Sequence, residues 1–217
     1  MSGHGLLIFD LDGTLFRTDT VSVPAAQRTF EAFGLPIPRA AEICSFFGRS
    51  TSEWHTWLRA QSPPDLADEL IAAIDQHELE LVGETGELYP SVREALAALR
   101  PHVAHMAICS NGPEGYVEKV ISSQGIAAAF DAVRYRRADG KDKTRMVAEL
   151  LERLAGRPGI VIGDRWDDVE AAHANGLKAI GAAYGYGPLR ELVEADALAH
   201  TPAELPGLVL ALLGWEK

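Results

Sequence analysis

Cysteine is scarce in this chain of 217 residues, which contains only Cys44 and Cys109, both in apolar surroundings. A disulfide framework would use more cysteines in a shorter chain, so we interpret both as small buried side chains. No stretch reaches about 18 uninterrupted apolar residues, which argues against a transmembrane helix. The N-terminus lacks the basic region and the apolar run of a signal peptide. We therefore expect a soluble, cytoplasmic protein.

Basic residues are also few, since 20 lysines and arginines stand against 31 aspartates and glutamates and give a formal net charge of −11. The first lysine in the chain is Lys119. A surface that binds a phosphate backbone needs clustered lysine and arginine, and the sequence contains no such cluster. We therefore expect neither nucleic acid nor an anionic membrane surface as a partner.

Apolar residues make up 47% of the chain, enough for one large domain or for a domain with an insertion. Several apolar runs are continuous rather than alternating, which is typical of parallel strands covered on both faces. Helical patterns separate these runs, and strands that alternate with helices predict a doubly wound α/β sheet. The predicted strands are residues 6–9, 103–109, 160–162 and 179–182.

The helices between these strands are predicted from apolar spacing and from end signals. Residues 91–99 begin with Ser91 and have Glu94 three residues later, the spacing of a capping box. Residues 143–154 have apolar side chains on one helical face. Further helices are predicted over residues 113–124 and 168–175.

Residues 18–86 interrupt this alternation, because they contain helical patterns and no clear buried strand. We interpret this stretch as a helical insertion with its own aromatic core. Pro24 and Pro38 suit the first turn of two of its helices. The predicted helices are residues 23–33, 38–47, 52–60 and 65–82.

Residues with useful chemistry follow each central strand. In open α/β sheets, ligands bind outside the carboxyl ends of the strands, so these residues are brought to one edge. A lone aspartate there is usually a turn or cap residue and a lone lysine is usually solvated, but the complete set favours a functional site. The residues are Asp10 and Asp12 after the first strand, Ser110, Asn111 and Gly112 after the second, Asp164, Asp167 and Asp168 after the third, and Lys141 and Lys143 near a helix start.

Asp10 and Asp12 indicate a bound cation. Residues two apart in a strand point to the same side. Two carboxylates about 4 Å apart repel by roughly 4 kcal/mol at an effective dielectric near 20, and Asp164 adds to this repulsion. Either one acid is protonated or a cation is present, and oxygen-only ligands favour a hard cation, Mg²⁺ before Ca²⁺.

A site of this kind suits phosphoryl transfer. A carboxylate can attack phosphorus, as it does in enzymes that form an aspartyl phosphate. A lysine and the hydroxyl of Ser110 can hold the other phosphoryl oxygens. Gly13 and Thr14 turn the backbone so that its N–H groups can approach anionic oxygen.

Four segments of the chain resemble the motifs of the haloacid dehalogenase-like hydrolase superfamily. They read FDLDGTL, ICSNG, a lysine that opens a helix, and VIGDRWDD, in the family's order and across the whole chain. The helical insertion resembles the cap domain of phosphoglycolate phosphatase-like members. The resemblance implies a Rossmann-like core domain, residues 1–17 and 87–217, with a small α-helical cap domain, residues 18–86.

The resemblance also implies a role for each residue of the first two motifs. Asp10 is the expected nucleophile and a metal ligand. Asp12 is the expected general acid and then base, and its backbone carbonyl is a further ligand. Ser110 is expected to bind the phosphoryl group with the help of Asn111 and Gly112, and Gly13 and Thr14 are expected to contact the same group.

The remaining motifs imply the rest of the metal site and a cation for the phosphate. Asp164 is the expected ligand, and Asp168 supports the metal's water shell, with Asp167 as its nearest alternative. The chain lacks the common Lys-Pro pair, which leaves two lysines to choose between. We favour Lys143 over Lys141 because Lys143 opens the helix whose apolar face starts three residues later.

The sequence therefore predicts a Mg²⁺-dependent phosphatase, monomeric or homodimeric, for a small phosphorylated metabolite. Arg49 at the tip of the cap loop FFGRSTSEW suits an anionic or polar substrate, although a solvated loop arginine fits equally well. A dehalogenase would not need Asp12, and Schiff-base chemistry would need a cap lysine. A phosphosugar mutase stays open, and a phosphoacceptor signalling module or a non-catalytic binding protein are further alternatives. The substrate itself is not readable from the sequence.

Overall fold

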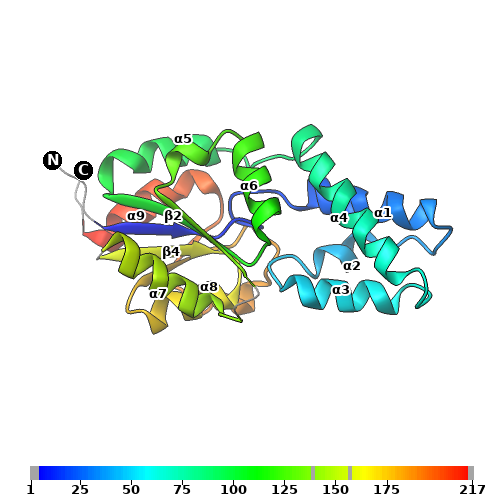
Figure 1. Cartoon of the computed structure of the whole chain (residues 1–217). Coiled ribbons are helices and arrows are strands. Elements are labelled where there is room, and N and C mark those ends of the chain that lie inside the picture. The colour runs from blue at the N-terminus through cyan, green and yellow to red at the C-terminus, as the bar shows by residue number, and fades with distance from the viewer. Residues whose placement is uncertain (1–4, 138–139, 156–157, 215–217) are drawn as a thin grey trace.

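The computed structural model describes residues 5–137, 140–155 and 158–214, and its centre is a parallel sheet in the order β3-β2-β1-β4-β5-β6 (Figure 1). β1 lies between β2 and β4, so the strand order reverses at β1. Ligands bind at such switch points in open α/β sheets. The strands are β1 (Leu6–Phe9), β2 (His105–Ser110), β3 (Ala132–Tyr135), β4 (Gly159–Gly163), β5 (Lys178–Ala182) and β6 (Ala197–Ala199).

Helices cover both faces of this sheet (Figure 1). One face packs against α5 (Val92–Leu99), α6 (Glu114–Ser123) and α9 (Leu205–Leu213), and the other against α7 (Lys143–Leu154) and α8 (Trp166–Ala174). This is the doubly wound arrangement that the sequence predicts. Short 3₁₀ helices are Arg100–His102, Ala127–Ala129, Leu189–Glu191 and Pro202–Glu204.

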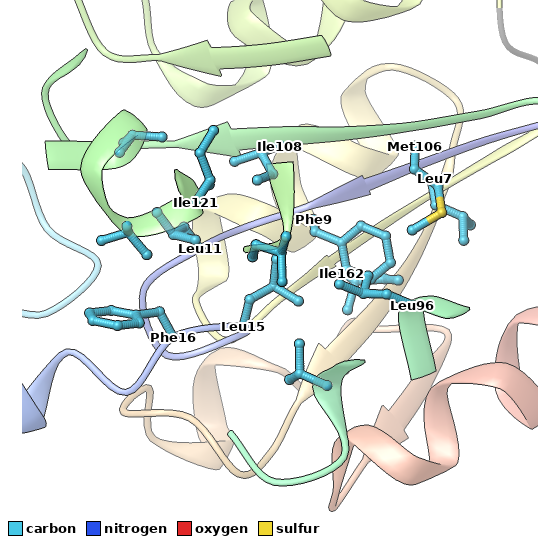
Figure 2. Packing of buried hydrophobic residues seen from close by; sticks show 14 of the residues in the cluster. Leu7, Phe9, Leu11, Leu15, Phe16, Leu96, Met106, Ile108, Ile121 and Ile162 are labelled. Carbon is cyan, nitrogen blue, oxygen red and sulfur yellow. The ribbon is translucent and has the colours of Figure 1, made fainter. Parts of the chain in front are cut away.

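Burial on both faces explains why β1 is apolar at every position. Successive residues of a strand point to opposite sides. Leu7 and Phe9 join the cluster under α5, α6 and α9, whereas Leu6 and Ile8 join the cluster under α7 and α8. All four side chains are fully buried. Figure 2 shows the first of these clusters, with Phe9 in its centre.

The insertion forms four helices that lie beside the sheet, beyond the end of β1 (Figure 1). Their apolar faces make a separate cluster that includes Phe30, Ile43, Leu58 and Leu70. In the described ranges, no helix has the length and apolar composition needed to cross a membrane. The helices are α1 (Asp19–Ala32), α2 (Ala40–Cys44), α3 (Thr51–Ala60) and α4 (Ala67–Glu84).

Two strands, β3 and β6, were not predicted from the sequence. β3 contains Arg134, whose buried side chain pairs with Glu149, so the strand is not a continuous apolar run. β6 has only three residues and lies at the edge of the sheet, where neither length nor burial produces a recognisable pattern. By contrast, β1 and α7 have the predicted bounds.

The predicted capping box at Ser91 is wrong. Ser91 has φ 68°, in the left-handed region, and its hydroxyl makes no capping hydrogen bond. An N-cap side chain reaches the first turn from extended backbone, which Ser91 does not adopt.

The predicted positions of two prolines are also wrong. Pro24 lies inside α1, which begins at Asp19, and Pro38 precedes the N-cap residue of α2. A proline inside a helix removes the hydrogen bond to the carbonyl four residues back. Here the hydroxyl of Thr85 donates to that carbonyl, on Thr20, at 3.2 Å.

Ile8→Ala should lower the free energy of unfolding by about 2–5 kcal/mol, because it leaves a cavity in the middle of the sheet. Urea denaturation measures this change. Ile37→Ala is the matched control, since Ile37 is 53% exposed and should change stability by less than about 0.5 kcal/mol. Equal effects of the two substitutions would contradict the assignment of β1 to the core.

Candidate active site

The ends of three strands and the starts of two helices converge beyond the carboxyl edge of the sheet. Asp10 follows β1, Ser110 ends β2, and Asp164 follows β4. Lys143 is the first residue of α7, and Asp168 lies in the first turn of α8. All five are buried, so the structure brings together residues that lie up to 158 positions apart in the chain, from Asp10 to Asp168.

A buried ion pair organises this group. The Nζ atom of Lys143 lies 2.7 Å from Asp10 Oδ1 and 2.6 Å from Asp168 Oδ1. Lys141 instead pairs with Glu149. Of the two candidate lysines, Lys143 is therefore the one that lies among the acids.

Three carboxylates crowd this lysine. Oxygen atoms of Asp10, Asp164 and Asp168 all lie within 4.8 Å of one another. Asp164 Oδ2 accepts hydrogen bonds from the backbone N–H groups of Tyr186 and Gly187, at 2.7 and 3.1 Å. Asp10 Oδ2 and Asp164 Oδ1 are buried without a hydrogen-bond partner in the described part of the chain.

The pKa values follow from burial and charge. Burial raises the pKa of Asp10 to about 6, although Lys143 lowers it. Burial and the charge of Asp10 raise the pKa of Asp164 to about 7, and burial raises that of Asp168 well above its usual range. Burial opposes the charge of Lys143, but Asp10 and Asp168 outweigh it, so its pKa is raised.

This donor set fits a hard divalent cation. One ammonium group cannot neutralise three carboxylates, and each unpartnered oxygen costs free energy when it is buried. Carboxylate oxygens are the ligands that Mg²⁺ prefers, and Asp10 Oδ2 and Asp164 Oδ1 are available for it.

Asp12 lies apart from the three crowded acids. Its Oδ1 atom accepts hydrogen bonds from the hydroxyls of Tyr116 and Thr18, at 2.6 and 2.7 Å. Burial raises the pKa of Asp12, and these two hydrogen bonds lower it in part. The two acids of the first motif therefore have different surroundings, with Asp10 among charges and Asp12 among hydroxyls.

In the second motif, Ser110 lies in the site and Asn111 connects it to neighbouring residues. The Ser110 hydroxyl accepts a hydrogen bond from the N–H of Gly112 at 3.0 Å. The Asn111 amide donates to the carbonyl of Gly48 in the insertion, at 3.1 Å, and to Asp167 Oδ2, at 2.9 Å. Asp167 is thus held by Asn111, and the acid that lies in the metal-binding group is Asp168.

Close backbone approach explains two of the glycines. Gly13 has φ +84°, and a Cβ atom there would lie 2.4 Å from Asp164 Oδ2. A Cβ atom on Gly163 would lie 2.0 Å from the carboxyl carbon of Asp168. Next to Gly13, Thr14 is fully buried, and its hydroxyl has no hydrogen-bond partner among the described residues.

A cavity of about 320 Å³ extends from Asp10 and Asp12 into the insertion. The loop that contains Arg49 lines this cavity. The Arg49 side chain is 44% exposed, lies 3.8 Å from Glu53, and its guanidinium carbon is 5.7 Å from the ring centre of Phe46.

Three polar residues around this cavity were not found from the sequence. Tyr116 and Thr18 hold Asp12, and Glu78 lines the cavity from α4. Tyr116 is 104 residues from Asp12, so only the tertiary fold reveals the contact. For Glu78, an acid on the face of a helix that also buries Leu81 and Ile74 was the available signal.

Comparison with known proteins agrees with this geometry. The sequence profile of the haloacid dehalogenase-like hydrolases matches residues 7–182. The chain belongs to the haloacid dehalogenase-like hydrolase family. A phosphoglycolate phosphatase from Vibrio vulnificus (strain YJ016) is 30% identical over 94% of this chain and 96% of its own length, which places the chain in the phosphatase branch of the family.

Solved structures share the family's fold with this chain. A haloacid dehalogenase-like hydrolase from Streptococcus pneumoniae has a TM-score of 0.80 at 23% identity, over 98% of this chain and all of its own. A variant of CbbY from Rhodobacter sphaeroides, solved with xylulose-(1,5)bisphosphate, has a TM-score of 0.75 at 22% identity, over 93% and 96% of the two chains.

The Mg²⁺-free protein should lose stability as the pH rises. Folding raises the pKa of Asp10 and Asp164 from 3.8 to about 6 and about 7, so the stabilisation is complete below about pH 4 and is lost as the pH passes those values. Glu78, with a pKa raised to about 7, adds to the trend. In EDTA, the urea midpoint should be lower at pH 7.5 than at pH 5.

Added Mg²⁺ should reverse this loss, because the cation binds the ionised carboxylates. The urea midpoint should rise more at pH 7.5 than at pH 5, and Asp164→Asn should reduce that difference. An equal rise at both pH values would show that these acids are not the binding group.

Tyr116→Phe should raise the pKa of Asp12, because it removes a hydrogen bond that favours the carboxylate. Carboxyl ¹³C NMR titration measures the shift. Tyr135→Phe is the matched control, since the Tyr135 hydroxyl pairs with Glu114 rather than with Asp12. If neither variant changes the pKa of Asp12, the hydrogen bond from Tyr116 has no electrostatic effect on that carboxyl group.

Proposed function

We propose that this protein is a Mg²⁺-dependent phosphatase that hydrolyses a small phosphomonoester through a phosphorylated Asp10. The observation that carries the proposal is the buried group of Asp10, Asp164 and Asp168 around Lys143. One oxygen of Asp10, after β1, and one of Asp164, after β4, have no hydrogen-bond partner among the described residues. The similarity to phosphoglycolate phosphatase supports it.

Asp10 is the nucleophile in this proposal. One of its oxygens pairs with Lys143, and the other has no hydrogen-bond partner among the residues that the structure describes. Its carboxylate attacks phosphorus, the bond to the leaving oxygen breaks, and an aspartyl phosphate forms. Lys143, the hydroxyl of Ser110 and the backbone N–H of Asn111 hold phosphoryl oxygens. The N–H groups of Gly13, Thr14 and Gly112 instead donate to Phe16 O, Leu11 O and Ser110 Oγ and shape the backbone around the site.

Asp12 moves the protons. Its raised pKa lets it carry the proton that the leaving oxygen needs. It then takes a proton from the water that attacks the aspartyl phosphate. Tyr116 and Thr18 both bind Oδ1 and so fix the orientation of the carboxyl group during both transfers.

Asp10, Asp164 and the backbone carbonyl of Asp12 would hold Mg²⁺, with Asp168 in support. When bound, the cation neutralises these acids and stabilises negative charge on the phosphoryl oxygens. The same charge balance keeps Asp10 ionised, which a nucleophile with a pKa raised to about 6 requires near neutral pH.

We also propose that residues 18–86 act as a cap domain over a core of residues 1–17 and 87–217, of which residues 1–4, 138–139, 156–157 and 215–217 lie outside the described ranges. In support, α1 to α4 pack around their own apolar cluster, and Arg165 beside Asp164 donates to the carbonyl of Phe47 in the cap, at 2.7 Å. Cytoplasmic location and a monomeric or homodimeric state remain predictions.

Asp10→Asn should abolish hydrolysis of p-nitrophenyl phosphate while the protein stays folded, because the variant removes the attacking carboxylate and one buried charge. Released p-nitrophenol measures turnover, and circular dichroism checks the fold. Asp19→Asn is a control, since Asp19 pairs with Arg17 outside the acid group. Near-normal turnover by Asp10→Asn would disprove the mechanism.

EDTA should stop turnover by the unmodified protein, and Mg²⁺ should restore it. Beryllofluoride should form an adduct on Asp10. An adduct without hydrolysis of any phosphomonoester would favour a phosphomutase or a phosphoacceptor protein over a phosphatase. Turnover that is unaffected by EDTA would reject the metal site.

A further inference from the structure

The cavity beside Asp12 has the dimensions and position of a binding site for the leaving group. It holds about 320 Å³, opens on Asp10 and Asp12 at one end, and ends among α1, α3 and α4 of the insertion. If Asp10 attacks phosphorus, as proposed above, the part of the substrate bound to phosphorus lies in this cavity. The residues that line the cavity therefore indicate what kind of leaving group it can bind.

Aromatic rings form one wall. Phe46 and Trp54 line the cavity with their ring centres 5.5 Å apart, and Trp54 stacks on Trp57 at 5.2 Å, which holds the pair in place. Aromatic faces bind apolar C–H surfaces and cations, and their negative potential disfavours anions.

Two acids form another part of the lining. Asp75 and Glu78 are three residues apart on α4, so they lie on the same helical face. The Ser22 hydroxyl donates to Glu78 Oε1. In the described part of the chain, no lysine or arginine forms an ion pair with Glu78. Burial and the charges of Asp12 and Asp75 raise its pKa to about 7, against the effect of Ser22.

Cations are correspondingly rare around this cavity. Arg49 is the sole lysine or arginine among the described residues that line it, and its guanidinium is already beside Glu53 and Phe46. Residues 18–86 contain four arginines, no lysine and eleven acids, a formal charge of −7 from 4 − 11. A leaving group with a carboxylate would meet Asp75 and Glu78, and Arg49 is the one lysine or arginine among the described lining residues that could pair with it. His55, outside the lining, already lies 3.4 Å from Asp75.

We propose that this cavity binds a leaving group that has no negative charge and donates a hydrogen bond to Glu78, either from a hydroxyl or from an ammonium group, while its carbon skeleton lies against Phe46 and Trp54. The inference rests on the proposed phosphatase activity. It separates this protein from the phosphoglycolate phosphatases it resembles, because phosphoglycolate carries a carboxylate where the cavity has acids.

Three phosphomonoesters of similar size test the proposal: glycerol 3-phosphate with hydroxyls, phosphoethanolamine with an ammonium group, and phosphoglycolate with a carboxylate. With Mg²⁺, kcat/KM for at least one of the first two should exceed that for phosphoglycolate by about tenfold or more, the value of one charge-assisted hydrogen bond. Preference for glycerol 3-phosphate identifies the hydroxyl donor, and preference for phosphoethanolamine identifies the ammonium donor.

Variants of Glu78 link this preference to the residue. Glu78→Met removes the acceptor at similar length and should raise KM about tenfold for the preferred ester. The KM for phosphoglycolate should not rise, because the variant removes a negative charge that repels the carboxylate. Glu78→Gln keeps an acceptor for a hydroxyl but loses the charge for an ammonium group. Glu80→Met is the control, since Glu80 is exposed two residues further along α4. Thermal unfolding of each variant separates lost binding from lost folding.

The same esters distinguish failure of this proposal from failure of the phosphatase assignment. Calorimetric titration of Asp10→Asn with each ester measures binding without turnover, and p-nitrophenyl phosphate reports hydrolysis with a leaving group that the panel does not include. The proposal is overturned if phosphoglycolate binds more tightly than the other two esters. It is also overturned if Glu78→Met lowers the affinity for all three esters equally. Selective binding without hydrolysis of any ester overturns the phosphatase assignment alone.

Discussion

The structure of the site depends on the ion pair between Lys143 and two buried aspartates. Three carboxylates within 4.8 Å of one another repel strongly in a buried setting, and the ammonium group of Lys143 neutralises part of that charge. The first residue of α7 must therefore lie at the end of β1, which ties the position of the helix to the position of Asp10. The negative charge that remains fits the divalent cation proposed for this site.

Much of this arrangement was predictable because its signals are local. β1 is apolar at every position since both faces of the sheet are covered, and Lys143 opens a helix with one apolar face. Both elements have the predicted bounds. The motif order then located Asp10, Ser110 and Asp164, because parallel strands end at one edge of the sheet.

The features that the sequence did not reveal depend on contacts between distant residues or on backbone conformation. Arg134 makes β3 unlike a buried strand, but Glu149 on α7 neutralises it. Ser91 has the spacing of a capping box, but its left-handed backbone directs the hydroxyl elsewhere. The hydrogen bond from Tyr116 to Asp12 joins residues 104 positions apart, and no local sequence pattern predicts it. Helices and strands leave local patterns in the sequence, whereas contacts between residues this far apart are set by the fold.

The contacts at Gly13 and Gly163 bear on how such a protein can change over evolutionary time. Backbone without side chains touches Asp164 and Asp168 at these two positions, so an added methyl group would displace the acids themselves. Substitutions at Gly13 and Gly163 would therefore disturb the acid group directly. The faces of α3 and α4 that line the cavity have no such glycine contact in the described ranges, so substitutions there can change which substrate is bound without displacing these acids.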